Sequence, residues 1–225
     1  MHKLFRYDFI YLIPLLLSAI FSLRSFGLKW PKPYRIFSIY LILTLCTEIF
    51  AIAWKWYLYK TVYWNYSKSN LWIYNSFHLP RILLFILFYY KMIDSIIIKR
   101  NILITGAVLL LFGIIDYLYI QPLHSMNNYT LIFTNIFCVI LALLFFRQVL
   151  QEKKIIKLSG YPMIWISLGT LLYFAGSLPY FIFFNYLFEN YKELALSLLN
   201  IHQALNIIMY TSYLIAFLCK PPSAK

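Results

Sequence analysis

The sequence predicts an all-α integral membrane protein: a seven-transmembrane-helix bundle with its N-terminus outside and its C-terminus inside. Three observations support this fold class. The 225 residues are 63% hydrophobic and 12% charged, with a mean hydropathy of +0.73. Seven apolar stretches follow one another, and basic residues gather in alternate loops. Soluble domains are about 45–50% apolar and about 25% charged. We therefore interpret residues 1–225 as a single membrane domain.

The helix count follows from segment lengths. A spanning helix needs about 20 mainly apolar residues. We predict helices over residues 9–25, 36–57, 72–91, 102–120, 130–148, 163–187 and 194–218. The first and fifth segments are the least regular, so their ends are the least well defined.

The first segment follows Lys3 and Arg6, as the apolar part of a signal peptide would. Asp8 interrupts the basic stretch and no small-residue cleavage motif follows, so we expect a retained helix. Between the first two segments, Trp30–Pro31–Lys32–Pro33 is expected to break the helix, because proline removes a backbone donor.

Orientation follows from the basic residues. With the N-terminus outside, thirteen of the 20 Lys and Arg side chains fall on the cytoplasmic side: Arg24, Lys29, Lys32, Arg35, Lys91, Lys99, Arg100, Arg147, Lys153, Lys154, Lys157, Lys220 and Lys225. Cytoplasmic loops carry such an excess. The same placement explains the net charge of +13 without a nucleic-acid partner, so no nucleic acid is expected.

Polar residues within the segments are predicted to share one depth. Successive helices alternate in direction, so late residues of one segment meet early residues of the next. This places most of them in the outer half: Glu48, Lys55, Asn75, His78, Arg81, Asp116, Thr134, Asn135, Ser177, Tyr180, Asn185, Asn200, His202, Gln203 and Asn206. The inner half is expected to be mainly Leu, Ile, Phe and Val. We interpret Tyr and Trp at segment ends, including Tyr89, as interfacial belts.

Helical spacing predicts which of these side chains face inward. Residues three, four or seven apart share a face, and lipid offers polar groups no partner. Asn75, His78 and Arg81 lie on one face, and Glu48 is predicted to form an ion pair with Arg81. Asp116, near a helix end, is expected to be solvated. The candidate ligand-binding residues are Glu48, Asn75, His78, Arg81, Asn200, His202, Gln203 and Asn206.

Two structural alternatives stay open at this point. The Glu48–Arg81 pair would also serve packing alone. The amide side chains of the last segment would also serve as interhelical hydrogen bonds, worth about 0.6 kcal/mol each.

The functional prediction is a membrane protein of the bacterial inner membrane that binds a small or amphiphilic ligand in an outward-facing pocket. The plan is similar, in outline, to seven-helix receptors and sensors. Such a protein would act through a cytoplasmic or membrane partner, or as a homo-oligomer, because only six residues follow Cys219. No cofactor is indicated.

Two other functions stay open. A transporter would use Pro80 and Pro179 for alternating access. An intramembrane enzyme would use His78 and His202, although two histidines without a clear third ligand make a weak metal site.

Overall fold

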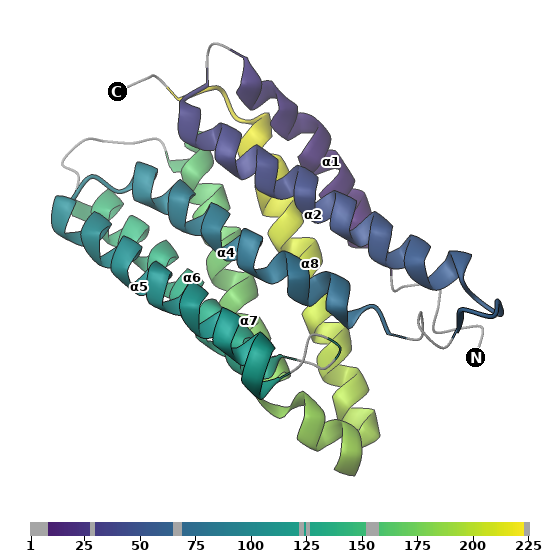
Figure 1. Cartoon of the computed structure of the whole chain (residues 1–225). Coiled ribbons are helices and arrows are strands. Elements are labelled where there is room, and N and C mark those ends of the chain that lie inside the picture. Colours follow the sequence, from purple (N-terminus) through teal and green to yellow (C-terminus); the bar gives the residue numbers. More distant parts are fainter. Residues whose placement is uncertain are drawn as a thin grey trace.

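The described part of the chain forms six long helices, preceded by one shorter helix (Figure 1). The structure is a computed structural model that describes residues 9–27, 30–64, 69–121, 124, 127–151 and 158–222. It contains α1 (Leu12–Ser22), α2 (Lys32–Tyr57), α4 (Leu71–Met92), α5 (Ile96–Ile115), α6 (Asn128–Gln151), α7 (Pro162–Asn190) and α8 (Lys192–Leu218). A 3-10 turn, Leu23–Phe26, extends α1, and a π-helical turn, Asp116–Ile120, extends α5.

In the part of the chain that the structure describes, six helices are long and apolar enough to cross a membrane: α2, α4, α5 with its π turn, α6, α7 and α8. The first, Leu12–Phe26, is apolar but shorter. At about 1.5 Å per residue it covers about 22 Å, less than the roughly 30 Å of a bilayer core. The predicted number of helices agrees with the structure. The orientation across the membrane stays a prediction.

Helix ends differ from the prediction where local chemistry extends a segment. Pro33 lies in the first turn of α2, where the missing N–H has no intrahelical partner to lose, so the helix begins at Lys32 rather than at residue 36. The hydroxyl of Ser95 accepts a hydrogen bond from the Ile98 amide, and α5 begins six residues before the predicted 102. Residues 1–8, with Lys3 and Arg6, lie outside the described residues.

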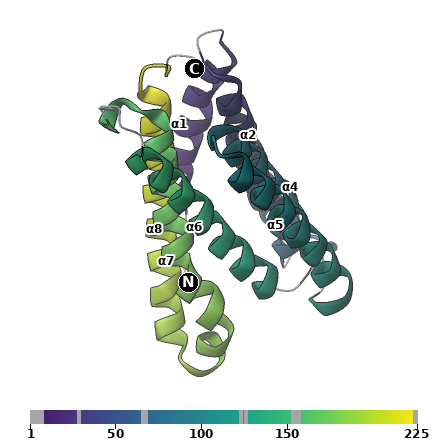
Figure 2. The same ribbon diagram turned by 90° about the vertical axis from the view of Figure 1, so that its left-hand side faces the viewer.

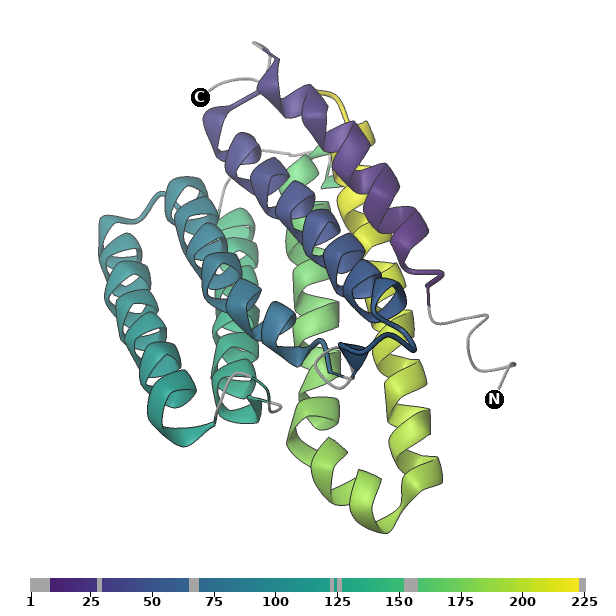
Figure 3. The ribbon, with the colours of Figure 1, turned by 45° about the vertical axis from the view of Figure 1, so that its right-hand side comes forward.

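The helices form a ring in chain order. Each helix packs against the next one along the chain, and α1 closes the ring against α8. Figure 2 shows α6 running between the α7–α8 pair and the α4–α5 pair. In Figure 3 the connected ends of α7 and α8 extend beyond the other helices.

One end of the ring is filled by aromatic side chains. The ring of Phe37 lies 4.9 Å from those of Phe88 and Tyr213, centroid to centroid, and Trp30 lies 5.5 Å from Phe217. We call this group, with Tyr34 and Phe85, the aromatic core; all seven side chains are buried. Such pairs stabilise a fold beyond the area they bury.

This half is more polar than predicted. Ser25 and Ser38 are hydrogen-bonded at 2.7 Å, and Thr170 and Tyr213 at 3.1 Å. Tyr89 is fully buried and its hydroxyl lies 3.3 Å from that of Ser167, so its assignment to an interfacial belt was wrong. Each hydroxyl is tolerated inside because a hydroxyl on another helix pairs with it.

Candidate functional site

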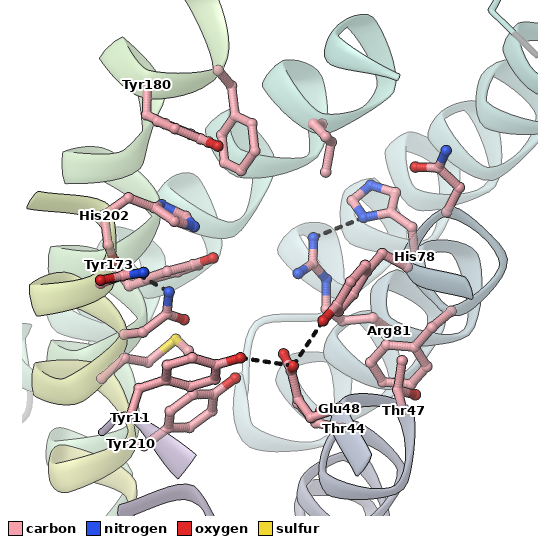
Figure 4. A pocket seen from close by; sticks show the side chains of 18 of the residues that line it. Tyr11, Thr44, Thr47, Glu48, His78, Arg81, Tyr173, Tyr180, His202 and Tyr210 are labelled. Atoms are coloured by element: carbon pink, nitrogen blue, oxygen red, sulfur yellow. Dashed lines mark hydrogen bonds between the residues drawn. The ribbon is translucent and has the colours of Figure 1, made fainter. Parts of the chain in front are cut away.

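A cavity of about 360 Å³ lies inside the ring, at the end opposite the aromatic core. Its walls come mainly from α2, α4, α7 and α8, with Tyr11 from the start of α1 (Figure 4). Because these helices alternate in direction, the second halves of α2 and α7 meet the first halves of α4 and α8. This volume falls in the range of small-molecule sites.

Seven of the eight predicted ligand-binding residues line the cavity: Glu48, Asn75, His78, Arg81, His202, Gln203 and Asn206. Asn200 does not line it and is exposed on α8. Its neighbour Leu199 does line the cavity, so Asn200 is at the right depth but projects from a different face of α8. The role of the seven residues in binding stays a prediction.

Glu48 is held by two tyrosines from other parts of the chain. Its Oε2 atom accepts a hydrogen bond from the Tyr11 hydroxyl at 2.8 Å and one from the Tyr74 hydroxyl at 2.9 Å. Tyr11 directly precedes α1 and Tyr74 lies on α4, so a carboxylate on α2 joins three elements. Two hydroxyl donors on one oxygen suit the ionised form, which only accepts.

Arg81 is held within its own helix. Its Nη2 atom lies 2.7 Å from Nδ1 of His78, and the guanidinium carbon lies 5.8 Å from the centre of the Phe174 ring. The prediction of an ion pair between Glu48 and Arg81 is wrong, because these two side chains form none in the described structure. Glu48 accepts hydrogen bonds from tyrosine hydroxyls instead, and Arg81 donates to a histidine of its own helix, α4. Both side chains face the cavity (Figure 4).

The partners of His78 define its protonation. Arginine only donates, so Nδ1 of His78 accepts from Arg81 and the ring proton lies on Nε2. Nε2–H therefore donates to the Thr134 hydroxyl at 3.1 Å, which donates in turn to the Thr130 carbonyl at 2.6 Å. His78 is thus the neutral Nε2–H tautomer. Its two hydrogen bonds fix the position of Arg81 and link α4 to α6.

The facing wall is aromatic. His202 stacks on Tyr180, with ring centres 4.6 Å apart and planes inclined by 13°. Phe181 meets the same imidazole edge-on at 5.4 Å, and Tyr173 lies at 5.4 Å. Nδ1 of His202 is buried and has no hydrogen-bond partner among the described residues. This wall offers flat apolar surface with one unused polar atom.

Four tyrosines of the cavity escaped the sequence prediction: Tyr11, Tyr40, Tyr74 and Tyr173. The chain has 21 tyrosines, and most were assigned to interfaces. Helical spacing carries the missing signal. Tyr40 lies four residues before Thr44 and eight before Glu48, and Tyr74 lies four before His78. The same rule that aligned the charged residues would have placed these rings beside them.

Other predicted polar residues lie outside the cavity. Asp116 is fully buried and accepts a hydrogen bond from the Thr130 hydroxyl at 2.5 Å, so its predicted solvation was wrong. The prediction failed because α6 packs against α5 and covers this side chain. Asn135 donates to Ser177 at 3.2 Å, which joins α6 to α7 as interhelical hydrogen bonds do. Lys55 is exposed, and the side chain of Asn185 lies outside the described residues.

The donor set gives no clear metal centre. In the described ranges, no three His, Cys, Asp or Glu side chains come together in a way that could hold a metal ion. The chemistry of the cavity is therefore that of one acid, one base and several aromatic rings. Comparison with protein-family models, with curated proteins and with solved structures finds no match to this chain.

Proposed function

We propose that this protein binds a small or amphiphilic ligand in the cavity and acts as a receptor or sensor through a partner protein. The cavity would face outward in a bacterial inner membrane. The observation that carries the proposal is the pair of charged side chains, Glu48 and Arg81, that line one cavity without pairing. Ionisable residues at membrane depth are costly and are typical of functional sites.

The end of the cavity next to the aromatic core favours ligand binding without transport. Tyr40 lines the cavity, and its ring lies 4.9 Å from Phe85 and 5.2 Å from Phe37. The aromatic core therefore begins directly at the cavity wall. A transported solute would require these close-packed rings to separate, which a receptor does not need.

Transport is the second candidate because two prolines lie within helices beside the cavity. Pro80 lies in α4, next to Arg81, and Pro179 lies in α7, next to Tyr180. Such interruptions provide hinges for alternating access. Enzymatic use of His78 and His202 has less support, since both nitrogens of His78 already bind Arg81 and Thr134.

A pair of variants on one helix tests the proposal. Asn206→Phe would fill the cavity, whereas Asn200→Phe adds the same ring to α8 outside it. Native mass spectrometry of protein purified from membranes should show one bound molecule on the wild type and on Asn200→Phe, but not on Asn206→Phe. Equal occupancy of the two variants, or none on the wild type, would contradict ligand binding in the cavity.

An uptake assay separates the two candidates. A receptor reconstituted in proteoliposomes should bind the identified molecule without accumulating it in the lumen. Accumulation that Asn206→Phe abolishes would favour the transporter instead.

A further inference from the structure

The two charges of the cavity define the chemical class of its ligand. We infer that the ligand is a zwitterion, with an acidic group that binds Arg81 and an ammonium group that binds near Glu48; this inference rests on the proposed function. Glu48 and Arg81 are the only Asp, Glu, Lys or Arg side chains among the described residues lining the cavity. A molecule with both charges would neutralise both walls at once.

Arg81 forms the acid-binding wall. Among the described residues its one hydrogen bond goes to an imidazole, which carries no negative charge in this tautomer. Its Nε atom is buried without a hydrogen-bond partner in the described structure. The guanidinium thus keeps unused donors beside the cavity, in the planar arrangement that matches a carboxylate or a phosphate. His78 holds the group in place before any ligand arrives.

Glu48 and its tyrosines form the ammonium-binding wall. Glu48 supplies the acidic group, and the rings of Tyr11 and Tyr74 are fixed beside it by their hydroxyl groups. Tyr40 and Tyr210 line the same cavity. A carboxylate among aromatic faces suits an ammonium group, which is attracted both by the charge and by the rings.

A ligand with a single charge fits less well. An anion would neutralise Arg81 and leave Glu48 uncompensated, and a cation would do the reverse. The bound ion would also place in the cavity a second charge of the same sign as the uncompensated residue, and such like-charge contacts are unfavourable. The zwitterion avoids this cost, and its body can rest on the stacked rings of Tyr180 and His202.

Such chemistry has two sources, a soluble amino acid and a zwitterionic lipid headgroup, and a probe panel distinguishes them. The full chain, in an uncharged maltoside detergent, is titrated by calorimetry. The soluble set is L-tryptophan, N-acetyl-L-tryptophan without the ammonium charge, and L-tryptophanamide without the acid. The lipid set is dihexanoylphosphatidylcholine and the anion-only dihexanoylphosphatidic acid.

The expected result is a preference of about tenfold or more for the zwitterion over its single-charge analogues in one of the two sets, as one charged hydrogen bond would give. Arg81→Gln should weaken the zwitterion and the anion-only probe but spare L-tryptophanamide. Glu48→Gln should weaken the zwitterion and L-tryptophanamide but spare the anion-only probe. Lys55→Gln and Glu189→Gln, which change exposed charges outside the cavity, should bind like the wild type.

Several outcomes would overturn the inference. Single-charge analogues that bind the wild type as tightly as both zwitterions refute it without any variant, so a misfolded Glu48→Gln does not obscure the test. Variants that fold but show no crossed pattern also refute it. If only the single-charge probes bind and Asn206→Phe abolishes their binding, ligand binding in the cavity is supported and the zwitterion inference is contradicted. If no probe binds and no molecule copurifies, the proposed function and the zwitterion inference are both contradicted.

Discussion

The two halves of the bundle use the same helices in opposite ways. In the half with the aromatic core, α2 and α8 place Phe37 and Tyr213 against each other, 4.9 Å between ring centres, and the side chains are buried. In the other half, the same helices place Glu48 and Asn206 on the walls of a cavity of about 360 Å³. One half packs the helices closely together, and the other leaves a cavity between them.

The halves also differ in how they treat buried polar atoms. Near the aromatic core, the hydroxyl groups of Ser25 and Thr170 pair with hydroxyls on other helices. Around the cavity, Arg81 Nε and His202 Nδ1 are buried without a hydrogen-bond partner in the described structure. An unpaired buried polar group costs about 1–3 kcal/mol. The exception in the aromatic core is Tyr34, whose buried hydroxyl also has no partner among the described residues. The cavity half still carries more of these costs, as is typical of a region that serves function rather than stability.

The largest effect should come from topology labelling, which is all or none. Thr61→Cys lies beyond α2 at the cavity end, and Ser159→Cys lies in the 3-10 turn before α7 at the other end. In a background of Cys46→Ser and Cys219→Ser, a membrane-impermeant maleimide should label Thr61→Cys in intact cells. Ser159→Cys should react only after permeabilisation. The reverse pattern would place the cavity on the cytoplasmic side.

The next effect concerns the packed half. Phe37→Ala should lower the free energy of unfolding by about 3–5 kcal/mol, because it removes a fully buried ring from the aromatic core. Phe183→Ala is the matched control, since Phe183 is 52% exposed on α7. Unfolding in mixed micelles, followed by circular dichroism, measures both. Equal losses would mean that the aromatic core does not dominate stability.

The packed half also shows what the sequence could predict. The apolar stretches were sufficient to find the seven main α-helices of the described residues, because length and composition determine which segments can span a bilayer. They were insufficient for the ends of α5, where Lys99 and Arg100 hid the helical turn that begins at Ile96. The π turn at Asp116 left no recognised pattern.

The cavity was predictable in part for a different reason. Helix direction and spacing brought Glu48, His78 and Arg81 to one cavity, since both follow from chain order. Their partners did not follow, because a hydrogen bond depends on rotamers and on neighbouring helices. Thus Glu48 was paired with Arg81 on charge alone, whereas the structure pairs it with two tyrosines.

A smaller effect compares two glycines of α7. A Cβ atom on Gly169 would lie 2.8 Å from Cβ of Ser212 and 3.1 Å from the Met209 carbonyl oxygen, whereas one on Gly176 would meet the flexible end of Leu205. Gly169→Ala should therefore cost about 1–3 kcal/mol of unfolding free energy. Gly176→Ala should cost less because the contact is with the flexible end of a side chain and not with the backbone. The same unfolding measurement checks both.

Gly160→Ala provides the control for this pair, because nothing lies within 4 Å of the added Cβ. A cost for Gly176→Ala as large as that for Gly169→Ala would show that the cavity half is as tightly packed as the aromatic half.

The smallest effect should come from Arg81→Gln in protein without ligand. The change removes the hydrogen bond to His78 and the contact with Phe174, but it also removes an unpaired charge, and these terms offset each other. We expect the unfolding free energy to change by no more than about 1 kcal/mol, measured as for Phe37→Ala. A loss of unfolding free energy as large as that of Phe37→Ala would make Arg81 a structural residue. The two halves would then differ in the chemistry of their side chains, but both would serve stability.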